Sequence, residues 1–136
     1  MDDIFELINN WKKENTKEVF SQIAKLTSKR LDYLSSICSK YKDLNVFDDI
    51  FWCGWWEFEN ISDITETHIE FYARHLYEGD YDKIIVPLRW FTITNVEFLN
   101  EIRTRKIKKI DNEISKLQNK IDDYHKIKSE IENIKF

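Results

Sequence analysis

The last third of the chain carries apolar residues at alternating intervals of three and four. These residues are Ile107, Ile110, Ile114, Leu117, Ile121 and Tyr124. They fill the a and d positions of a heptad, the pattern of a helix that packs against a partner along its length. Ile127, Ile131 and Ile134 then continue the pattern one residue early, a stammer that would locally overwind a supercoil. The spacing predicts a long C-terminal helix that forms an oligomer, and Ile at a with Leu at d favours two strands.

Two amphipathic segments precede residue 44. Residues 3–12 predict a short helix, and Asn15 as N-cap with Glu18 at N3 predicts the start of a second helix over residues 16–43. The second helix has its own apolar seam, formed by Phe20, Ala24, Thr27, Leu31, Leu34, Cys38 and Tyr41. Two seams in one chain predict helices that pack on each other, on a sheet or across a dimer axis.

The middle of the chain changes to an alternating pattern, which is typical of strands. We expect strands at residues 49–59, 64–77 and 81–90, with a turn at 60–63 and a hairpin turn at Glu78-Gly79-Asp80. Pro87 cannot donate a ladder hydrogen bond, so the third strand is expected to lie at an edge or to end there. Most of the five aromatic rings at positions 51–58 are expected in the core, but they exceed what one core face holds, so one set is expected at an oligomer interface or lining a ligand pocket.

These elements predict an α+β fold, in which long N-terminal helices and a long C-terminal coiled-coil-like helix flank a three-stranded antiparallel meander. Thr94 and Glu97 form a capping box that starts the last helix. The chain is expected to be one domain over residues 1–136, with a helical part at 1–43, a sheet at 47–92 and the oligomerisation helix at 94–136.

Composition limits the loops, the state of the cysteines and the compartment that we expect for this chain. Of the 136 residues, 34% are charged and 15% aromatic, while two Gly and one Pro leave little room for elaborate loops. Cys38 and Cys53 have no metal-ligand spacing, and we expect buried free thiols in a reducing compartment. No signal peptide and no membrane-spanning apolar run is visible, so the sequence predicts a soluble cytoplasmic protein.

Acidic residues gather in the sheet region, where residues 44–82 hold ten acids against one base, Arg74. The simpler interpretation is a solvent-exposed surface that keeps the protein soluble. The alternative is a docking face, formed by Glu57, Glu59, Glu66 and Glu70, that presents phosphate-like charge to a basic protein partner. Such a face would repel nucleic acid, so direct DNA or RNA binding is not expected.

Basic residues gather at the head of the last helix, where RTRKIKK at 103–109 holds five bases in seven positions. A phosphate could be held there, close to the positive end of the helix dipole, while an aromatic ring stacks a base. The candidate ligand residues are Arg103, Arg105, Lys106, Arg74, Arg89, Trp55 and Trp90. Alternatively, these bases pair with Glu101, with Asp111 or with the acidic sheet.

Patterns for catalysis and metal binding are weak. His68, His75 and His125 have no metal-ligand spacing with Cys or carboxylates, and no nucleophile motif or Gly-rich phosphate loop occurs. We therefore expect no catalytic residues, no metal and no cofactor.

The layout of long N-terminal helices, an aromatic antiparallel core and a C-terminal helix headed by RTRK resembles that of small phage-encoded anti-defence proteins. Within these it is most similar to the oligomeric sponges that sequester cyclic nucleotide signals. The resemblance implies ligand sites between subunits, where aromatic rings stack the base and arginines hold the phosphates, and a location in the host cell cytoplasm.

Three functions follow as hypotheses. The first is a non-enzymatic oligomer that captures a nucleotide-like ligand through Arg103, Arg105 and Trp55 or Trp90. The second is an anti-CRISPR-like protein–protein inhibitor that presents the acidic face to a basic enzyme groove. The third is a scaffold subunit whose coiled coil is its purpose.

Overall fold

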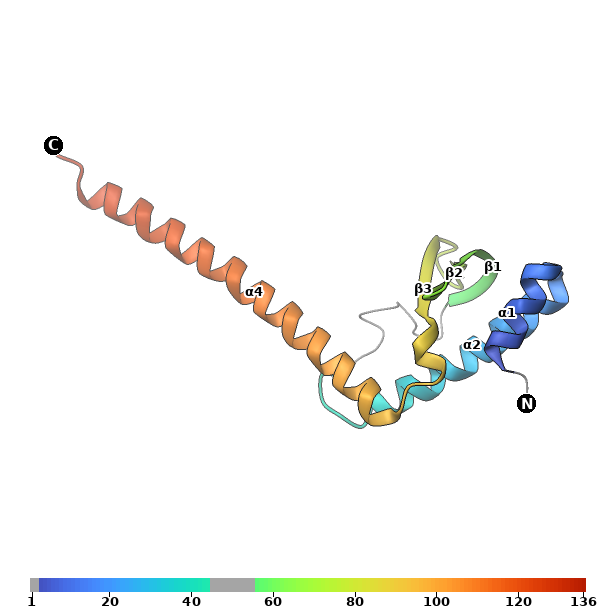
Figure 1. Cartoon of the computed structure of the whole chain (residues 1–136). Helices are drawn as coiled ribbons and strands as arrows, with labels where there is room; N and C mark the ends of the chain where they lie inside the picture. The colour runs from blue at the N-terminus through green and yellow to red at the C-terminus, as the bar shows by residue number, and fades with distance from the viewer. Residues whose placement is uncertain (1–2, 45–55) are drawn as a thin grey trace. The chain divides into compact units, whose positions relative to one another are not determined.

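The computed structural model describes residues 3–44 and 56–136, and it divides into two units, residues 1–100 and 101–136. In chain order the elements are α1 (Ile4–Lys13), α2 (Lys17–Cys38), β1 (Trp56–Ile64), β2 (His68–His75), β3 (Tyr81–Pro87), the 3₁₀ helix η1 (Leu88–Phe91) and α4 (Asn95–Glu132) (Figure 1). Helices and a three-stranded antiparallel sheet of order β1-β2-β3 confirm the α+β fold.

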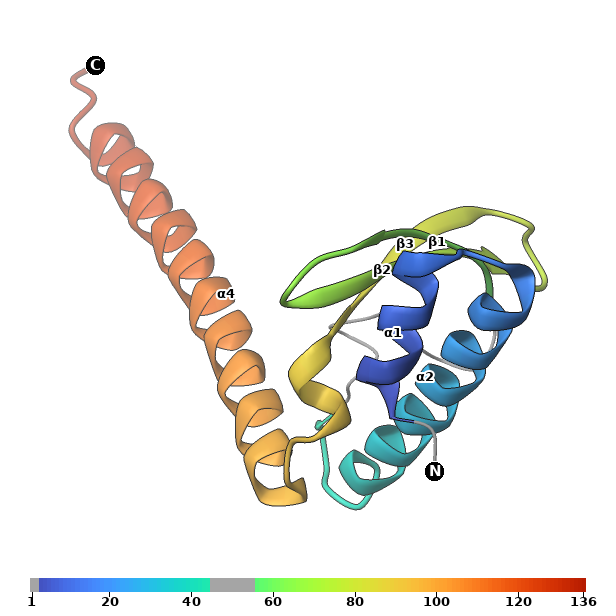
Figure 2. The same cartoon turned by 45° about the vertical axis from the view of Figure 1, so that its right-hand side comes forward.

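One face of the sheet is apolar and lies over α1 and α2 (Figures 1 and 2). Its buried side chains are Phe58, Ile61, Ile69, Phe71, Ala73, Ile84 and Val86. In the centre of this face the rings of Phe58 and Phe71 stack with centroids 4.0 Å apart. Since successive strand residues point to opposite faces, this alternation fixes which side of the sheet meets the helices.

The seam predicted for α2 supplies the other wall of the core. Leu31, Leu34 and Cys38 are buried, as is Thr27, whose hydroxyl donates to the carbonyl of Ile23 over 2.7 Å. This bond to a backbone carbonyl satisfies the hydroxyl of Thr27, whereas the buried Oγ of Ser35 has no hydrogen-bond partner among the residues that the structure describes. Ile23 and Ile37 widen the seam beyond the predicted set. The apolar face of α2 is therefore used within its own chain.

Helix bounds differ from the prediction at the ends. α2 begins one residue later than expected, because Thr16 is the N-cap and its hydroxyl accepts from the amide of Val19. It ends at Cys38, and Tyr41, which the seam included, lies beyond the helix and is exposed. At α4 the capping box is confirmed, since Thr94 and Glu97 exchange side-chain-to-backbone bonds of 3.2 and 3.3 Å.

The predicted turn at 60–63 is wrong, because β1 runs through it. The pairing of β1 with β2 shifts register twice, between Phe58 and Asn60 and between Ile61 and Asp63. Each shift adds a residue, so Phe58 and Ile61 are three positions apart and still share the buried face. Strict alternation cannot describe such a strand, and the turn instead falls at residues 65–67.

The other strand bounds are shorter than predicted. β2 covers His68–His75, which leaves Tyr77 outside the strand and 79% exposed. β3 ends at Pro87, as its missing N–H predicted, and the chain turns into η1. The hairpin turn before β3 is confirmed, with Gly79 at φ 71°, a conformation that costs glycine little. The expected strand segment 49–55 lies outside the described residues.

Truncation of the sheet centre tests this core. Phe71→Ala is expected to lower the free energy of unfolding by roughly 3–5 kcal/mol, because it removes a fully buried ring that stacks on Phe58. Its neighbour Tyr72 lies on the opposite face, so Tyr72→Ala is expected to cost about 1 kcal/mol. Urea unfolding followed by circular dichroism measures both. Equal losses would mean that the buried face is assigned to the wrong side.

Candidate functional site

The second unit is dominated by an exposed apolar face of α4. The described helix carries eight large hydrophobic residues at heptad spacing, Ile107, Ile110, Ile114, Leu117, Ile121, Tyr124, Ile127 and Ile131. Their exposed fractions range from 47% to 71%. A helix of 38 residues with a continuous apolar stripe of this kind normally buries it against another element.

Three polar side-chain pairs link residues along α4. Arg105 donates to Glu101 at 3.1 Å, Lys128 lies 3.8 Å from Glu132, and Gln118 donates to Asp122. All three are four residues apart, and each such pair stabilises an isolated helix by only about 0.2–0.5 kcal/mol. These pairs therefore leave the apolar face as the feature of α4 that most needs a partner.

The basic cluster predicted to hold a ligand lies at the start of the second unit. Arg103 is exposed, and Arg105 and Lys106 are half-buried. The bond from Arg105 to Glu101 is the pairing that the alternative interpretation of this cluster expected. One of its guanidinium groups is thus already engaged by a carboxylate.

The remaining candidate ligand residues belong to the first unit or lie outside the described residues. Trp90 is fully buried and meets the ring of Phe98 edge-on at 5.1 Å, so its faces are part of the core rather than a stacking surface. Arg89 is exposed on η1. Trp55 lies outside the described residues.

Arg74 lies between two of the predicted docking carboxylates. Its guanidinium donates to Glu57 at 3.3 Å and to Glu59 at 3.1 Å across the β1–β2 pair. The hydrogen bond to Glu57, and next the charge of Glu59, raise the pKa of Arg74 above its ordinary value. The side chains of Arg74, Glu57 and Glu59 are substantially exposed, so the two ion pairs contribute little to stability. They neutralise part of the negative charge of the acidic face.

The other two predicted docking residues are separated from this pair. Glu70 accepts a hydrogen bond of 2.8 Å from the hydroxyl of Ser62, and Glu66 lies in the turn between β1 and β2 rather than on a strand face. The open face of the sheet also carries Tyr72 with Lys83 over its ring at 5.4 Å. The open face of the sheet therefore carries Arg74, Lys83 and the ring of Tyr72 beside its carboxylates.

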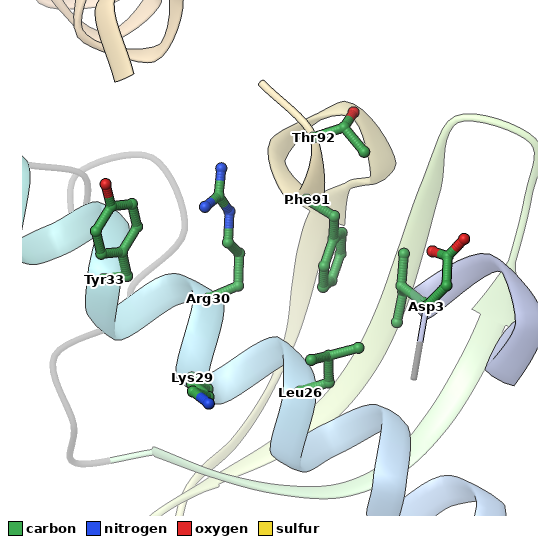
Figure 3. A pocket seen from close by; sticks show the side chains of 8 residues that line it. Asp3, Leu26, Lys29, Arg30, Tyr33, Phe91 and Thr92 are labelled. Atoms are coloured by element: carbon green, nitrogen blue, oxygen red, sulfur yellow. The ribbon is translucent and has the colours of Figure 1, made fainter. Parts of the chain in front are cut away.

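A shallow cavity of about 700 Å³ lies in the first unit, lined by Asp3, Ile4, Leu26, Lys29, Arg30, Tyr33, Phe91 and Thr92. Leu26 and Arg30 rise from α2 toward the segment that carries Phe91 and Thr92, with Asp3 at the start of α1 (Figure 3). The lining is mainly apolar, so the cavity suits an apolar group rather than a phosphate.

Arg30 has a structural role in this region. It donates to the carbonyl of Trp90 at 2.7 Å and to that of Ile93 at 3.0 Å, which joins α2 to the segment before α4. Charge-assisted bonds to carbonyls at the end of η1 satisfy groups that the helix leaves unpaired. The sequence analysis did not single out Arg30, although its position three residues after Thr27 places it beside the buried seam.

Among residues 3–44 and 56–136, no three His, Cys, Asp or Glu side chains are grouped so that they could hold a metal ion. In the same ranges, no helix combines the length and the apolar character that crossing a membrane requires. Cys38 is buried and forms no disulfide, as the sequence predicted, and Cys53 lies outside the described residues.

Comparison with models of protein families, with curated proteins and with solved structures gives no match to this chain. The resemblance to phage anti-defence proteins therefore stays a prediction, and the function has to be argued from the chain itself.

Removal of Arg30 separates a structural role from a ligand-binding one. Arg30→Ala is expected to lower the free energy of unfolding by roughly 1–3 kcal/mol, because two carbonyls lose their donor in a part-buried setting. Lys29→Ala, one residue away on the exposed side, is expected to change it by less than about 0.5 kcal/mol. Thermal and urea unfolding measure both, and a neutral Arg30→Ala would contradict the fastening role.

Proposed function

We propose that this protein is a non-enzymatic, homo-oligomeric interaction module that assembles through the apolar face of α4. The observation that carries the proposal is the row of eight large hydrophobic side chains on that helix, each roughly half exposed or more. Monomeric proteins rarely expose a contiguous apolar surface of this extent, and such surfaces mark interaction sites.

The free energy gained by burying the apolar face of α4 supports self-association. Full burial of an Ile or Leu side chain is worth roughly 1.5–3 kcal/mol, so covering the exposed half contributes about 1 kcal/mol per residue. Eight such residues on each of two chains give about 16 kcal/mol. This figure exceeds most of the range of about 4–15 kcal/mol estimated for the cost of association. A second copy of the same helix supplies the same spacing of apolar residues and so fits the face without a further partner.

The two other functions expected from the sequence have less support. Nucleotide capture relied on Arg103, Arg105 and Trp55 or Trp90; of these, Arg105 is paired with Glu101, Trp90 is buried, and Trp55 lies outside the described residues. Acidic mimicry relied on Glu57, Glu59, Glu66 and Glu70, and the open face of the sheet also carries Arg74, Lys83 and Tyr72. Assembly through α4 needs neither set, and it keeps the scaffold interpretation of the chain.

A charge placed in the seam tests the proposal. Ile114→Asp is expected to convert the oligomer to monomer at micromolar concentration, because an unpaired carboxylate buried at an a position costs several kcal/mol. Asn112→Asp adds the same group two residues away on the exposed side of the helix and is expected to leave the mass unchanged. Size-exclusion chromatography with light scattering reports the mass, and circular dichroism confirms that both variants fold.

Two results would refute assembly through α4. The first is a wild-type protein that is monomeric at tens of micromolar. The second is an Ile114→Asp variant with the wild-type oligomeric mass, which would place the self-association surface elsewhere.

A further inference from the structure

The residues that flank the seam of α4 carry a charge pattern with a direction. Those next to the core are the g positions, one residue before each a, and the e positions, one residue after each d. Before the stammer the g positions are Lys106, Glu113 and Lys120, and the e positions are Asp111, Gln118 and His125. After the stammer the g positions are Asp123 and Glu130, and the e positions are Lys128 and Lys135. Charged e and g residues set the orientation of paired helices.

We propose that α4 associates with a second copy in parallel and in register, an inference that rests on the proposed function. In this arrangement each g residue faces the e residue five positions later on the other chain. Lys106 then faces Asp111 and Asp123 faces Lys128, so both pairs combine opposite charges, and the symmetry of the assembly repeats each of them.

The other parallel positions add no like-charge pair. Glu113 faces the uncharged Gln118, and Lys120 faces the imidazole of His125 instead of another Lys or Arg. Glu130 and Lys135 follow the same rule of opposite charge, although Lys135 lies beyond Glu132, the last residue of α4. Along the whole seam, the parallel alignment is therefore free of repulsion at the flanking positions.

Antiparallel alignments that keep the apolar layers face each other lack this property. They place g against g and e against e. Alignment of Ile107 with Ile131 sets Lys120 against its own copy. Alignment of Ile107 with Ile134 sets Glu113 against Glu130, and it also sets Lys120 against Asp123 and Asp111 against Lys128. Alignment of Ile107 with Tyr124 avoids like charges but leaves Ile127 and Ile131 outside the shared seam. Each of these antiparallel alignments has a like-charge pair or leaves part of the seam uncovered, and the parallel alignment has neither, which favours the parallel arrangement.

A parallel arrangement has a consequence at the head of the helix. Residues 103–109 hold five bases on each chain, and parallel α4 helices bring both sets to the same end of the assembly. The bond from Arg105 to Glu101 within each chain, and the facing of Lys106 and Asp111 between chains, offset part of the resulting repulsion. The same flanking positions face each other in parallel dimers and parallel trimers, so the measured mass gives the number of chains.

Cysteine cross-linking distinguishes the orientations on the full chain. In a parallel assembly Ile131→Cys brings two thiols into one layer near the C-terminal end, and a disulfide links the chains in glutathione buffer. The antiparallel alignments separate the two positions by at least about 30 Å at 1.5 Å per residue, which no disulfide spans. Ser129→Cys is the matched control, because it lies at the same end on the outer face and is expected not to cross-link in any arrangement.

Each outcome has a distinct meaning. Wild-type protein on the same non-reducing gel sets the background from Cys38 and Cys53, and light scattering under reducing conditions reports the mass. Linked Ile131→Cys with unlinked Ser129→Cys supports the parallel arrangement. An oligomer in which Ile131→Cys links only when mixed with Ile110→Cys or Ile107→Cys overturns it. A monomer under reducing conditions refutes the proposed function itself.

Charge reversal gives an independent test. Asp123→Lys and Lys128→Glu, each alone, are expected to raise the dissociation constant about tenfold, because each creates two like-charge pairs per dimer. The double variant Asp123→Lys/Lys128→Glu restores opposite charges in a parallel assembly and is expected to return to within about threefold of wild type. Sedimentation equilibrium measures the constants. Single variants without effect, or a double variant no tighter than the singles, would overturn the parallel arrangement.

Discussion

Burial of one sheet face against α2 is the interaction on which the first unit depends. The stacked rings of Phe58 and Phe71 meet a helix whose Leu31 and Leu34 are completely or almost completely covered. Once that contact is made, the apolar face of α2 is used up within its own chain. Arg30 then fastens the segment before α4 to the same helix through two carbonyls. Within residues 3–44 and 56–136, the longest regularly spaced row of exposed apolar side chains lies on α4.

The contrast between the two heptad seams carries the functional argument. Both have the same periodicity, yet Leu31 is 1% exposed and Leu117 is 50% exposed. A helix of this length in water owes most of its stability to packing of its apolar side, since propensity and single i,i+4 pairs contribute only tenths of a kcal/mol each. Packing against an intermolecular partner therefore accounts for a helix that is straight and long and that carries charged residues on both sides of its apolar face. In the parallel assembly that we propose, the charges of Asp123 and Lys128 set the orientation of that partner.

Placement of side chains changes the weight of the ligand hypotheses. An aromatic residue and several arginines in a sequence suggest a phosphate and base site, but each must also have a free face. Trp90 has none, because its ring lies against Phe98 in the core, and Arg74 is held by two carboxylates of the neighbouring strand. The same salt bridges reduce the net negative charge of the sheet face. Both changes result from strand pairing, which brings together residues that are far apart in the sequence.

The sequence by itself determined the class of fold, the capping box of Thr94 and Glu97, the Gly79 hairpin and the end of β3 at Pro87, because local backbone chemistry decides these features. It also determined the heptad of α4. Only the tertiary structure decided that β1 continues through two bulges, that Trp90 is core and that Arg30 bonds to carbonyls sixty residues away. These features depend on which surfaces meet, and a linear pattern of apolar and polar residues does not contain that information. The two seams show the same point, since identical spacing led to burial in α2 and to exposure in α4.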